Sequence, residues 1–157
     1  MKWIIKDVKK CSPKLRRIFV ASTPLGEDYM REAVILSKKR KENNYIAVAL
    51  FNEKELIGWA MLDYFLSKGS KNTRTYIYVK TKFRRKGYGT KILNKARDVS
   101  KKMNCEGIKV CPHTKSSLKF FKKANIKKEE VVRGYKYWLP VMYYVCYYKS
   151  ASYKVYK

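Results

Sequence analysis

Basic residues and two closely spaced glycines occur together at positions 80–89, which read KTKFRRKGYG. A strand-like apolar run precedes the segment and an apolar run of helical period follows it, so we expect a loop leading into a helix N-terminus. The first turn of a helix leaves N–H groups unpaired, and its dipole favours negative charge. Because Gly87 and Gly89 lack a Cβ, a phosphate can approach the backbone closely. The segment therefore predicts a binding site for a phosphorylated ligand, although its spacing is not that of a P-loop or a dinucleotide fingerprint.

The chain as a whole is strongly basic. Its 157 residues include 38 Lys and Arg but only 12 Asp and Glu, which gives a formal net charge of +26. Positions 64–128 hold 20 of the basic and 2 of the acidic residues, a net of +18. A charge of this size predicts an acidic partner, such as nucleic acid, an anionic surface or a phosphorylated ligand.

Length and composition are those of one folded domain, which we expect to span 1–157. The longest uncharged stretch, 137–148, is too short to cross a bilayer, and residues 1–6 lack the apolar region of a signal peptide. The four cysteines form no C-x-x-C pair and there is one histidine, so we expect no metal site and a reduced, intracellular protein of the cytoplasm. Monomer and homodimer both remain open.

Periodicity predicts the elements that must position the basic loop. Short apolar or alternating runs predict strands, and runs with apolar residues every three or four positions predict helices. We expect helices over 13–21, 27–41, 87–104 and 114–124. We expect strands over 2–8, 45–51, 56–66, 73–79, 107–111, 129–138 and 141–149. This order predicts a single α/β (α+β) domain with a mixed sheet.

Residues 79–93 resemble the acetyl-CoA signature of the GNAT family of N-acetyltransferases. That family has a strand with an aliphatic end, an Arg/Gln-x-x-Gly-x-Gly/Ala loop and a helix with paired aliphatic residues. Arg84, Gly87 and Gly89 match the fixed loop positions, and apolar residues stand at Val79, Ile92 and Leu93. Thr81 stands where the family usually has proline.

Two further segments extend the resemblance to residues 45–126. Positions 114–126 are similar to a later helix of the family, with Phe120 matching and Asn125 in place of the glycine that ends it. Residues 56–60, LIGWA, are similar to an upstream strand. The resemblance implies a mixed, mostly antiparallel sheet flanked by helices, with a splayed pair of central strands. The tyrosine-rich strands of 129–149 would complete it.

The family transfers an acetyl group from acetyl-CoA to an amine. The resemblance implies that backbone amides of the loop hold the pyrophosphate and that the strand before it pairs with the pantetheine arm. It assigns acetyl-CoA binding to Ile77, Tyr78, Val79, Arg84, Arg85, Lys86, Gly87, Tyr88, Gly89, Thr90, Ser117 and Phe121.

Transfer to an amine also requires a base for the attacking ammonium and an acid for the departing thiolate. The family's usual acid is a tyrosine, and Phe121 stands at that position here. We expect the catalytic groups among Asp63, His113 and Tyr144, with Tyr76, Tyr78 and Tyr143 as other phenols and Cys111 as a nearby thiol. Asp63 as a surface carboxylate and His113 as a helix cap are the competing interpretations.

The excess of positive charge directs the expectation for the acceptor. We expect nucleic acid, or an amine associated with it, before a protein amine, and a small amine last. Lysines outside the loop would contact the nucleic acid, namely Lys95, Lys101, Lys102, Lys119, Lys122 and Lys123. The alternative is a catalytically impaired, basic GNAT-like module that either binds nucleic acid or acts as an inhibitor.

Overall fold

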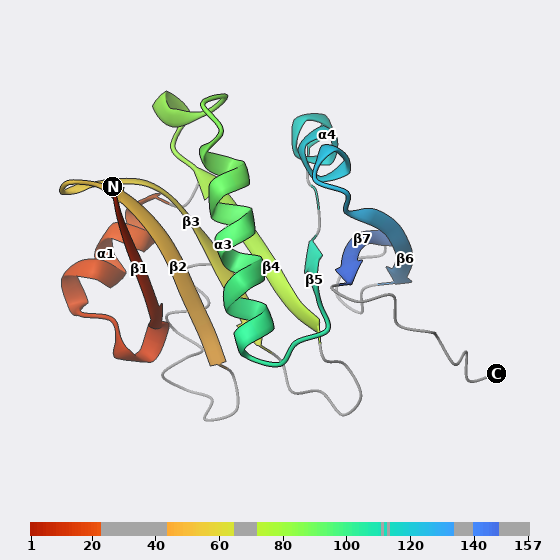
Figure 1. Ribbon diagram of the computed structural model, residues 1–157, viewed down its shortest axis with the longest axis horizontal. Coiled ribbons are helices and arrows are strands. Elements are labelled where there is room, and N and C mark those ends of the chain that lie inside the picture. Colours follow the sequence, from red (N-terminus) through yellow and green to blue (C-terminus); the bar gives the residue numbers. More distant parts are fainter. Residues whose placement is uncertain (23–43, 65–71, 111, 113, 134–139, 148–157) are drawn as a thin grey trace.

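The computed structural model of the chain describes residues 1–22, 44–64, 72–110, 112, 114–133 and 140–147 (Figure 1). Seven strands form one sheet in the order β1-β2-β3-β4-β5-β7-β6. The strands are β1 (Lys2–Asp7), β2 (Asn44–Asn52), β3 (Glu55–Tyr64), β4 (Asn72–Val79), β5 (Gly107–Val110), β6 (Lys127–Arg133) and β7 (Pro140–Tyr147). The helices are α1 (Pro13–Ser22), α3 (Tyr88–Lys102) and α4 (Lys115–Lys123), with short 3₁₀ turns η1 (Val8–Lys10) and η2 (Thr81–Phe83).

All neighbouring strands are antiparallel except β4 and β5, which are parallel. These two pair only through their first residues, Asn72–Arg74 with Gly107–Lys109. Beyond Arg74 the strands separate, so that the β5-facing edge of 75–79 has no partner in the sheet. The expected mixed, mostly antiparallel sheet with a splayed central pair is confirmed.

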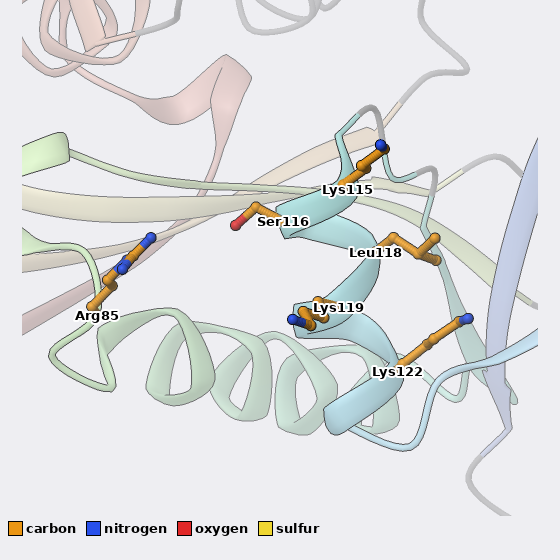
Figure 2. A pocket seen from close by; sticks show the side chains of 6 residues that line it. All are labelled: Arg85, Lys115, Ser116, Leu118, Lys119 and Lys122. Carbon is orange, nitrogen blue, oxygen red and sulfur yellow. The ribbon is translucent and has the colours of Figure 1, made fainter.

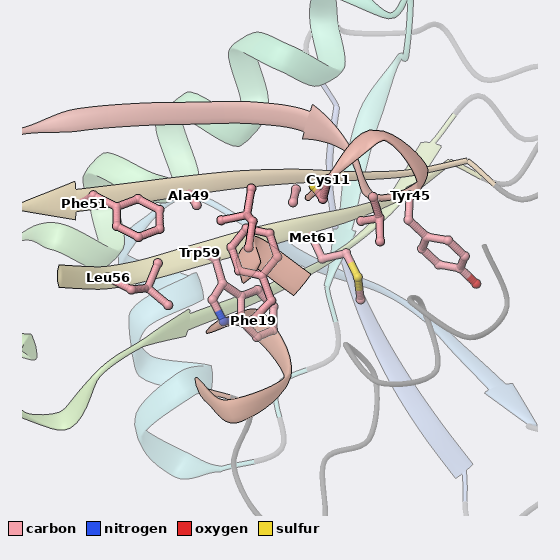
Figure 3. Close-up of a cluster of buried hydrophobic side chains, with 11 residues drawn as sticks. Cys11, Phe19, Tyr45, Ala49, Phe51, Leu56, Trp59 and Met61 are labelled. Atoms are coloured by element: carbon pink, nitrogen blue, oxygen red, sulfur yellow. The ribbon is translucent and has the colours of Figure 1, made fainter. Parts of the chain in front are cut away.

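Alternation along β2 and β3 sends apolar side chains to both faces of the sheet. One face packs against α1, where Phe19 meets Trp59 and Met61 in a closed cluster (Figure 3). The other face packs against α3 through residues such as Ile57, Leu62 and Ile92. The two helices thus cover opposite faces of the same strands.

Gly58 sets how closely α3 approaches the sheet. A Cβ at this position would lie 2.4 Å from the carbonyl oxygen of Tyr78 and 2.9 Å from Cδ1 of Ile92. No side chain fits there, so β3, β4 and α3 can pack tightly at the end of the sheet that carries the basic loop. At the other end of α3, the hydroxyls of Thr73 and Ser100 are 3.2 Å apart and buried, which ties the helix to the start of β4.

The predicted elements that fall in the described residues are present, with ends that differ by about two residues from expectation in most cases. The predicted helix 27–41 lies outside the described residues, as do the ends of the predicted strands 129–138 and 141–149. Within the part of the chain that the structure describes, no helix is long and apolar enough to span a membrane. No group of three or more His, Cys, Asp or Glu residues suited to a metal ion occurs there either.

Candidate active site

The basic loop connects the end of β4 to the first turn of α3. Its path is fixed by backbone hydrogen bonds, among them one from the Lys80 amide to the Ile57 carbonyl at 2.9 Å. Two residues adopt positive φ, Arg85 at 59° and Gly87 at 78°. Gly87 is the N-cap of α3, and no side chain caps the helix there. The N–H groups of this first turn therefore remain available to a bound anion, as the sequence predicts.

The three cationic residues before Gly87 have different roles. Arg84 turns back onto β4, where its Nε donates to the Val79 carbonyl at 2.9 Å and its guanidinium lies 5.8 Å from the Tyr78 ring. Arg84 therefore holds the loop against the strand end. Arg85 and Lys86 are exposed.

A glutamate from the neighbouring hairpin holds the start of the loop. Lys82 Nζ lies 2.7 Å from the Glu55 carboxylate, and Lys80 Nζ lies 3.5 Å from it. The hydrogen bond from Lys82 is the main reason that the pKa of Glu55 is lowered. The hairpin between β2 and β3 thus positions the loop through exposed ion pairs.

Gly89 faces an aromatic ring of α4. A Cβ on Gly89 would lie 3.4 Å from the ring of Phe120 and 3.9 Å from Cγ2 of Val79. The ring of Phe121 points elsewhere: it is 6% exposed and packs with Leu93 and Ile108 in the third apolar cluster of the protein. Phe120 is therefore the aromatic residue of α4 that lies beside Gly89, and the acetyl-CoA contact expected for Phe121 stays a prediction.

A hollow of about 490 Å³ lies between the loop and α4 (Figure 2). Ser116 and Lys119 point from α4 toward the loop segment that carries Arg85. The lining residues are Arg85, Lys115, Ser116, Leu118, Lys119 and Lys122. Four cationic side chains around one opening, beside an uncapped helix N-terminus, suit a ligand with several phosphate charges.

Ser117 does not face this hollow as an available ligand. Its backbone N–H donates to the Thr114 hydroxyl at 3.0 Å, and its own hydroxyl accepts from the Thr114 amide at 3.0 Å. This reciprocal capping box engages Ser117 in closing α4, so the serine at the opening is Ser116. The remaining predicted binding residues lie on the separated part of β4 (Ile77, Tyr78, Val79), in the loop (Arg84, Arg85, Lys86, Gly87) and in the first turn of α3 (Tyr88, Gly89, Thr90).

Asp63 is the one predicted catalytic residue whose side chain the structure describes. It is half-buried near the end of β3, and its Oδ1 is buried without a hydrogen-bond partner among the described residues. Burial raises its pKa, against a smaller lowering by the positive charge of Arg74. His113 and Cys111 lie outside the described residues, and Tyr144 is described only as backbone of β7, opposite Val110.

The six lysines predicted to contact nucleic acid do not form one patch. Lys119 and Lys122 line the hollow with Arg85. Lys95 lies toward the opposite side of α3, with its Nζ 5.8 Å from the ring of Trp3 in β1. Lys101 and Lys102 end α3, far along the helix from the loop (Figure 1), and Lys123 ends α4.

The comparison with known families decides the identity of this arrangement. The sequence model of the Acetyltransferase (GNAT) family matches residues 12–125. The chain belongs to the GNAT family of acetyltransferases. It is an acyltransferase whose acyl donor is acetyl-CoA. The uncapped N-terminus of α3 and the cationic hollow fit the phosphates of that donor.

Solved structures of other GNAT proteins share the fold. An aminoglycoside 6′-N-acetyltransferase complexed with coenzyme A has a TM-score of 0.69 at 16% identity, covering 92% of this chain and 96% of its own. A spermidine/spermine N-acetyltransferase from Vibrio cholerae has a TM-score of 0.66 at 14% identity, covering 93% and 92%. A GNAT acetyltransferase from Staphylococcus aureus Mu50 has a TM-score of 0.67 at 12% identity, covering 94% and 100%. No curated protein matches the chain.

Proposed function

We propose that this GNAT protein acetylates an amine carried by an acidic macromolecule, with nucleic acid or an amine associated with it as the first choice. The net charge of +26 is the observation that carries the proposal. The donor accounts for only part of it, because the hollow and the loop use a small share of the 38 basic residues. The remaining charge attracts polyanions and repels polycations.

This charge argues against the acceptors that two structural neighbours carry in their names. Two of them act, by name, on aminoglycosides and on spermidine or spermine. A polyamine would have to approach a strongly positive surface here, which lowers both its association rate and its affinity. Identities of 14–16% support only the shared fold, so the acceptor must be argued from this chain's own charges.

Lysines lie beside aromatic rings on α3, in η2 and at the contact of α3 with β1, which supports nucleic acid over other polyanions. Lys95 stands over Trp3, Lys91 Nζ lies 5.6 Å from the Tyr88 ring, and Lys82 Nζ lies 5.1 Å from the Phe83 ring. Lys102 continues the stripe of Lys91 and Lys95 by helical spacing. Cations that follow a phosphate backbone beside partly exposed rings are typical of sequence-tolerant nucleic-acid binding.

The proposal is tested with an oligonucleotide that carries a primary amine on a 5′ alkyl linker. Its control is the same amino-alkyl linker ending in a hydroxyl group, without the oligonucleotide. We expect intact-mass analysis to show one added acetyl group on the oligonucleotide and, at equal concentration, much less on the control. Equal acetylation of both would contradict an acidic carrier, and preferential acetylation of an acidic peptide would move the acceptor to proteins.

The salt dependence of binding measures how many lysines meet phosphates. If about five lysines meet phosphates of a duplex, log K should fall with log salt at a slope of about −4 to −5. Replacing Lys95, Lys101 and Lys102 with Gln should flatten the slope by up to ~3 and leave acetyl-CoA affinity unchanged, since none lines the hollow.

The matched control for this triple variant replaces three exposed lysines near α1, Lys6, Lys10 and Lys14, with Gln. It removes the same charge from another place. If both triple variants lower the affinity equally, Lys95, Lys101 and Lys102 are not part of a specific binding surface and the attraction is that of net charge alone.

A further inference from the structure

α1 covers one face of the sheet, and this face carries polar residues at the level where β4 and β5 separate. On that face Asp63 of β3 is the direct partner of Arg74 of β4, and Arg74 is the last residue of β4 that pairs with β5. The same row continues to Tyr45 on β2 and Lys109 on β5. The split between β4 and β5 begins just after Arg74, and we call this closed end its bottom. Asp63 therefore lies level with the bottom of the split, with β4 between them.

Asp63 has the properties that a base requires. One of its oxygens is buried with no hydrogen-bond partner among the described residues, so it has an unused acceptor. Arg74 beside it favours the ionised carboxylate, and burial favours taking up a proton. Among the described residues of β2, β3 and β4 Asp63 is the only aspartate, and the one glutamate there, Glu55, is bonded to Lys82 at the opposite end of β3.

Two tyrosines of β4 lie on the same face, and their positions differ. Tyr78 is next to the loop: its ring lies 5.8 Å from that of Trp59 and 5.8 Å from the Arg84 guanidinium. Tyr76 is one row nearer the bottom of the split, opposite Met61 and diagonal to Asp63. It is half-buried at the margin of the α1 cluster and belongs to the part of β4 that has no partner on its β5 side.

The family resemblance implies that the phosphates of the donor lie at the loop and that its pantetheine arm pairs with β4, which puts the thioester toward the other end of the separated stretch. The 75–79 stretch spans about 16 Å at ~3.3 Å per residue. Tyr76 lies at the far end of that stretch and Tyr78 at the near end. Phe121, in the core with Leu93 and Ile108, has neither the position nor the hydroxyl to serve there.

We propose that Asp63 and Tyr76 are the general base and the general acid of the acetyl transfer. This pair rests on the acetylation of an amine but is independent of whether the acceptor is nucleic acid. It assigns to β3 and β4 the two functions that α4 cannot supply, and it leaves Tyr78 as part of the surface that supports the loop.

The proton transfers balance as follows. Asp63 takes one proton from the attacking ammonium, and the freed lone pair of the amine forms the N–C bond to the acetyl carbonyl carbon. The C–S bond then breaks and its electron pair stays on sulfur, which takes the hydroxyl proton of Tyr76. The tyrosinate recovers a proton from the nitrogen that has become the amide, and Asp63 releases its own proton to water.

The test uses the thiol of CoA bound to the protein, whose ionisation is followed by thiolate absorbance and needs no acceptor. A phenol that donates to the thiolate lowers the thiol pKa, and a nearby carboxylate raises it. Tyr76→Phe should therefore raise the thiol pKa of bound CoA, by about 1–2 units for a hydrogen bond to a charged group. Asp63→Asn should lower it. Tyr45→Phe, which removes a phenol from β2 on the same face, is the matched control and should leave it unchanged.

Opposite shifts for the two variants support the pair, and the absence of a shift in Tyr76→Phe, or an equal shift in Tyr45→Phe, overturns it. Melting temperature and CoA affinity verify that each variant is folded, and Asp63→Ser replaces Asp63→Asn if the latter does not fold. With the amino-oligonucleotide, Tyr76→Phe should lower kcat by ~10²-fold or more and Tyr45→Phe by much less. If that probe is not acetylated while both pKa shifts are found, the proposed acceptor is wrong and the pair stands.

Discussion

The N-termini of α3 and α4 begin in opposite ways. α4 is closed by its own side chains, since Thr114 and Ser117 exchange hydrogen bonds in a capping box. α3 begins at Gly87 in the left-handed region, with no side-chain cap. Capping residues satisfy N–H groups that would otherwise be unpaired. The helix that forgoes this satisfaction is the one whose first turn is predicted to bind the phosphates of the cofactor, and an uncapped first turn is what an anion site requires.

The charges near the two helices show a second difference from ordinary helices. Neither first turn carries an acidic residue, and Lys115 begins α4 while Arg85 and Lys86 precede α3. Cations at a helix N-terminus oppose the dipole and destabilise the helix. Lys115 and Arg85 line the same hollow. Their unfavourable placement for stability is explained if an anion lies between them.

Filling the open N-terminus should have the largest effect. Even a Cβ added at Gly89 would lie 3.4 Å from the Phe120 ring, so the much larger indole of Gly89→Trp must occupy the region in front of the first turn of α3. We therefore expect complete loss of the thermal stabilisation by acetyl-CoA. Asn94→Trp adds the same ring at an exposed position further along α3 and should retain the stabilisation. A full thermal shift in Gly89→Trp would refute the assignment of this first turn to the phosphates.

Phe121→Tyr compares the two adjacent rings of α4. Because Phe121 is buried among apolar residues, the added hydroxyl should lower the free energy of unfolding by about 1–3 kcal/mol, measured by urea unfolding. Phe120→Tyr, at the half-buried position beside Gly89, should cost less. An increase in CoA release by Phe121→Tyr would show instead that residue 121 reaches the thioester.

Thr114→Ala removes the side-chain cap of α4, a kind of cap that α3 does not have. We expect a loss of about 1 kcal/mol in the free energy of unfolding, because the Ser117 amide loses its acceptor. Acetyl-CoA affinity, measured by calorimetry, should remain close to that of the wild type. A loss of affinity larger than the loss of stability would place the capping box in the binding site.

Glu55→Gln should have the smallest effect, because Lys80 and Lys82 are exposed partners. The pKa of Glu55 is lowered in the folded protein, so its contribution is complete above the ordinary glutamate pKa and is lost as the pH falls through the lowered value. The wild type and the variant should therefore differ slightly in melting temperature near neutral pH and converge in acid. High salt should also remove the difference.

The loop was predictable from the sequence because its function depends on residue types at fixed spacing. Arg84, Gly87 and Gly89 stand in the expected places, and the helix that follows has a clear apolar period. The sequence could not predict that Arg84 would bond to Val79 while Arg85 faces the hollow, because the two residues are adjacent and a loop has no period.

The face of α4 was only partly predictable. Successive residues of a helix differ by 100° in direction, so the spacing that places Phe121 with Leu118 in the core also turns Phe120 toward α3. That spacing can be read from the sequence, but the family pattern assigns a function only to Phe121, which stands at the position of the usual acid. The pairing of Asp63 with Arg74 could not be predicted from the sequence, because it depends on the register of β3 and β4.

β7 lies between β5 and β6, although it follows both in the chain. A ribosome releases β5 and β6 before the strand that must sit between them, so β6 has no strand to pair with until β7 has emerged. Partial chains would expose the outer edge of β5, an unpaired strand edge that favours association between chains. β5 is also one side of the split, and it gains its second neighbouring strand only when β7 has emerged. We therefore expect acetyl-CoA binding to begin only after β7 has been translated.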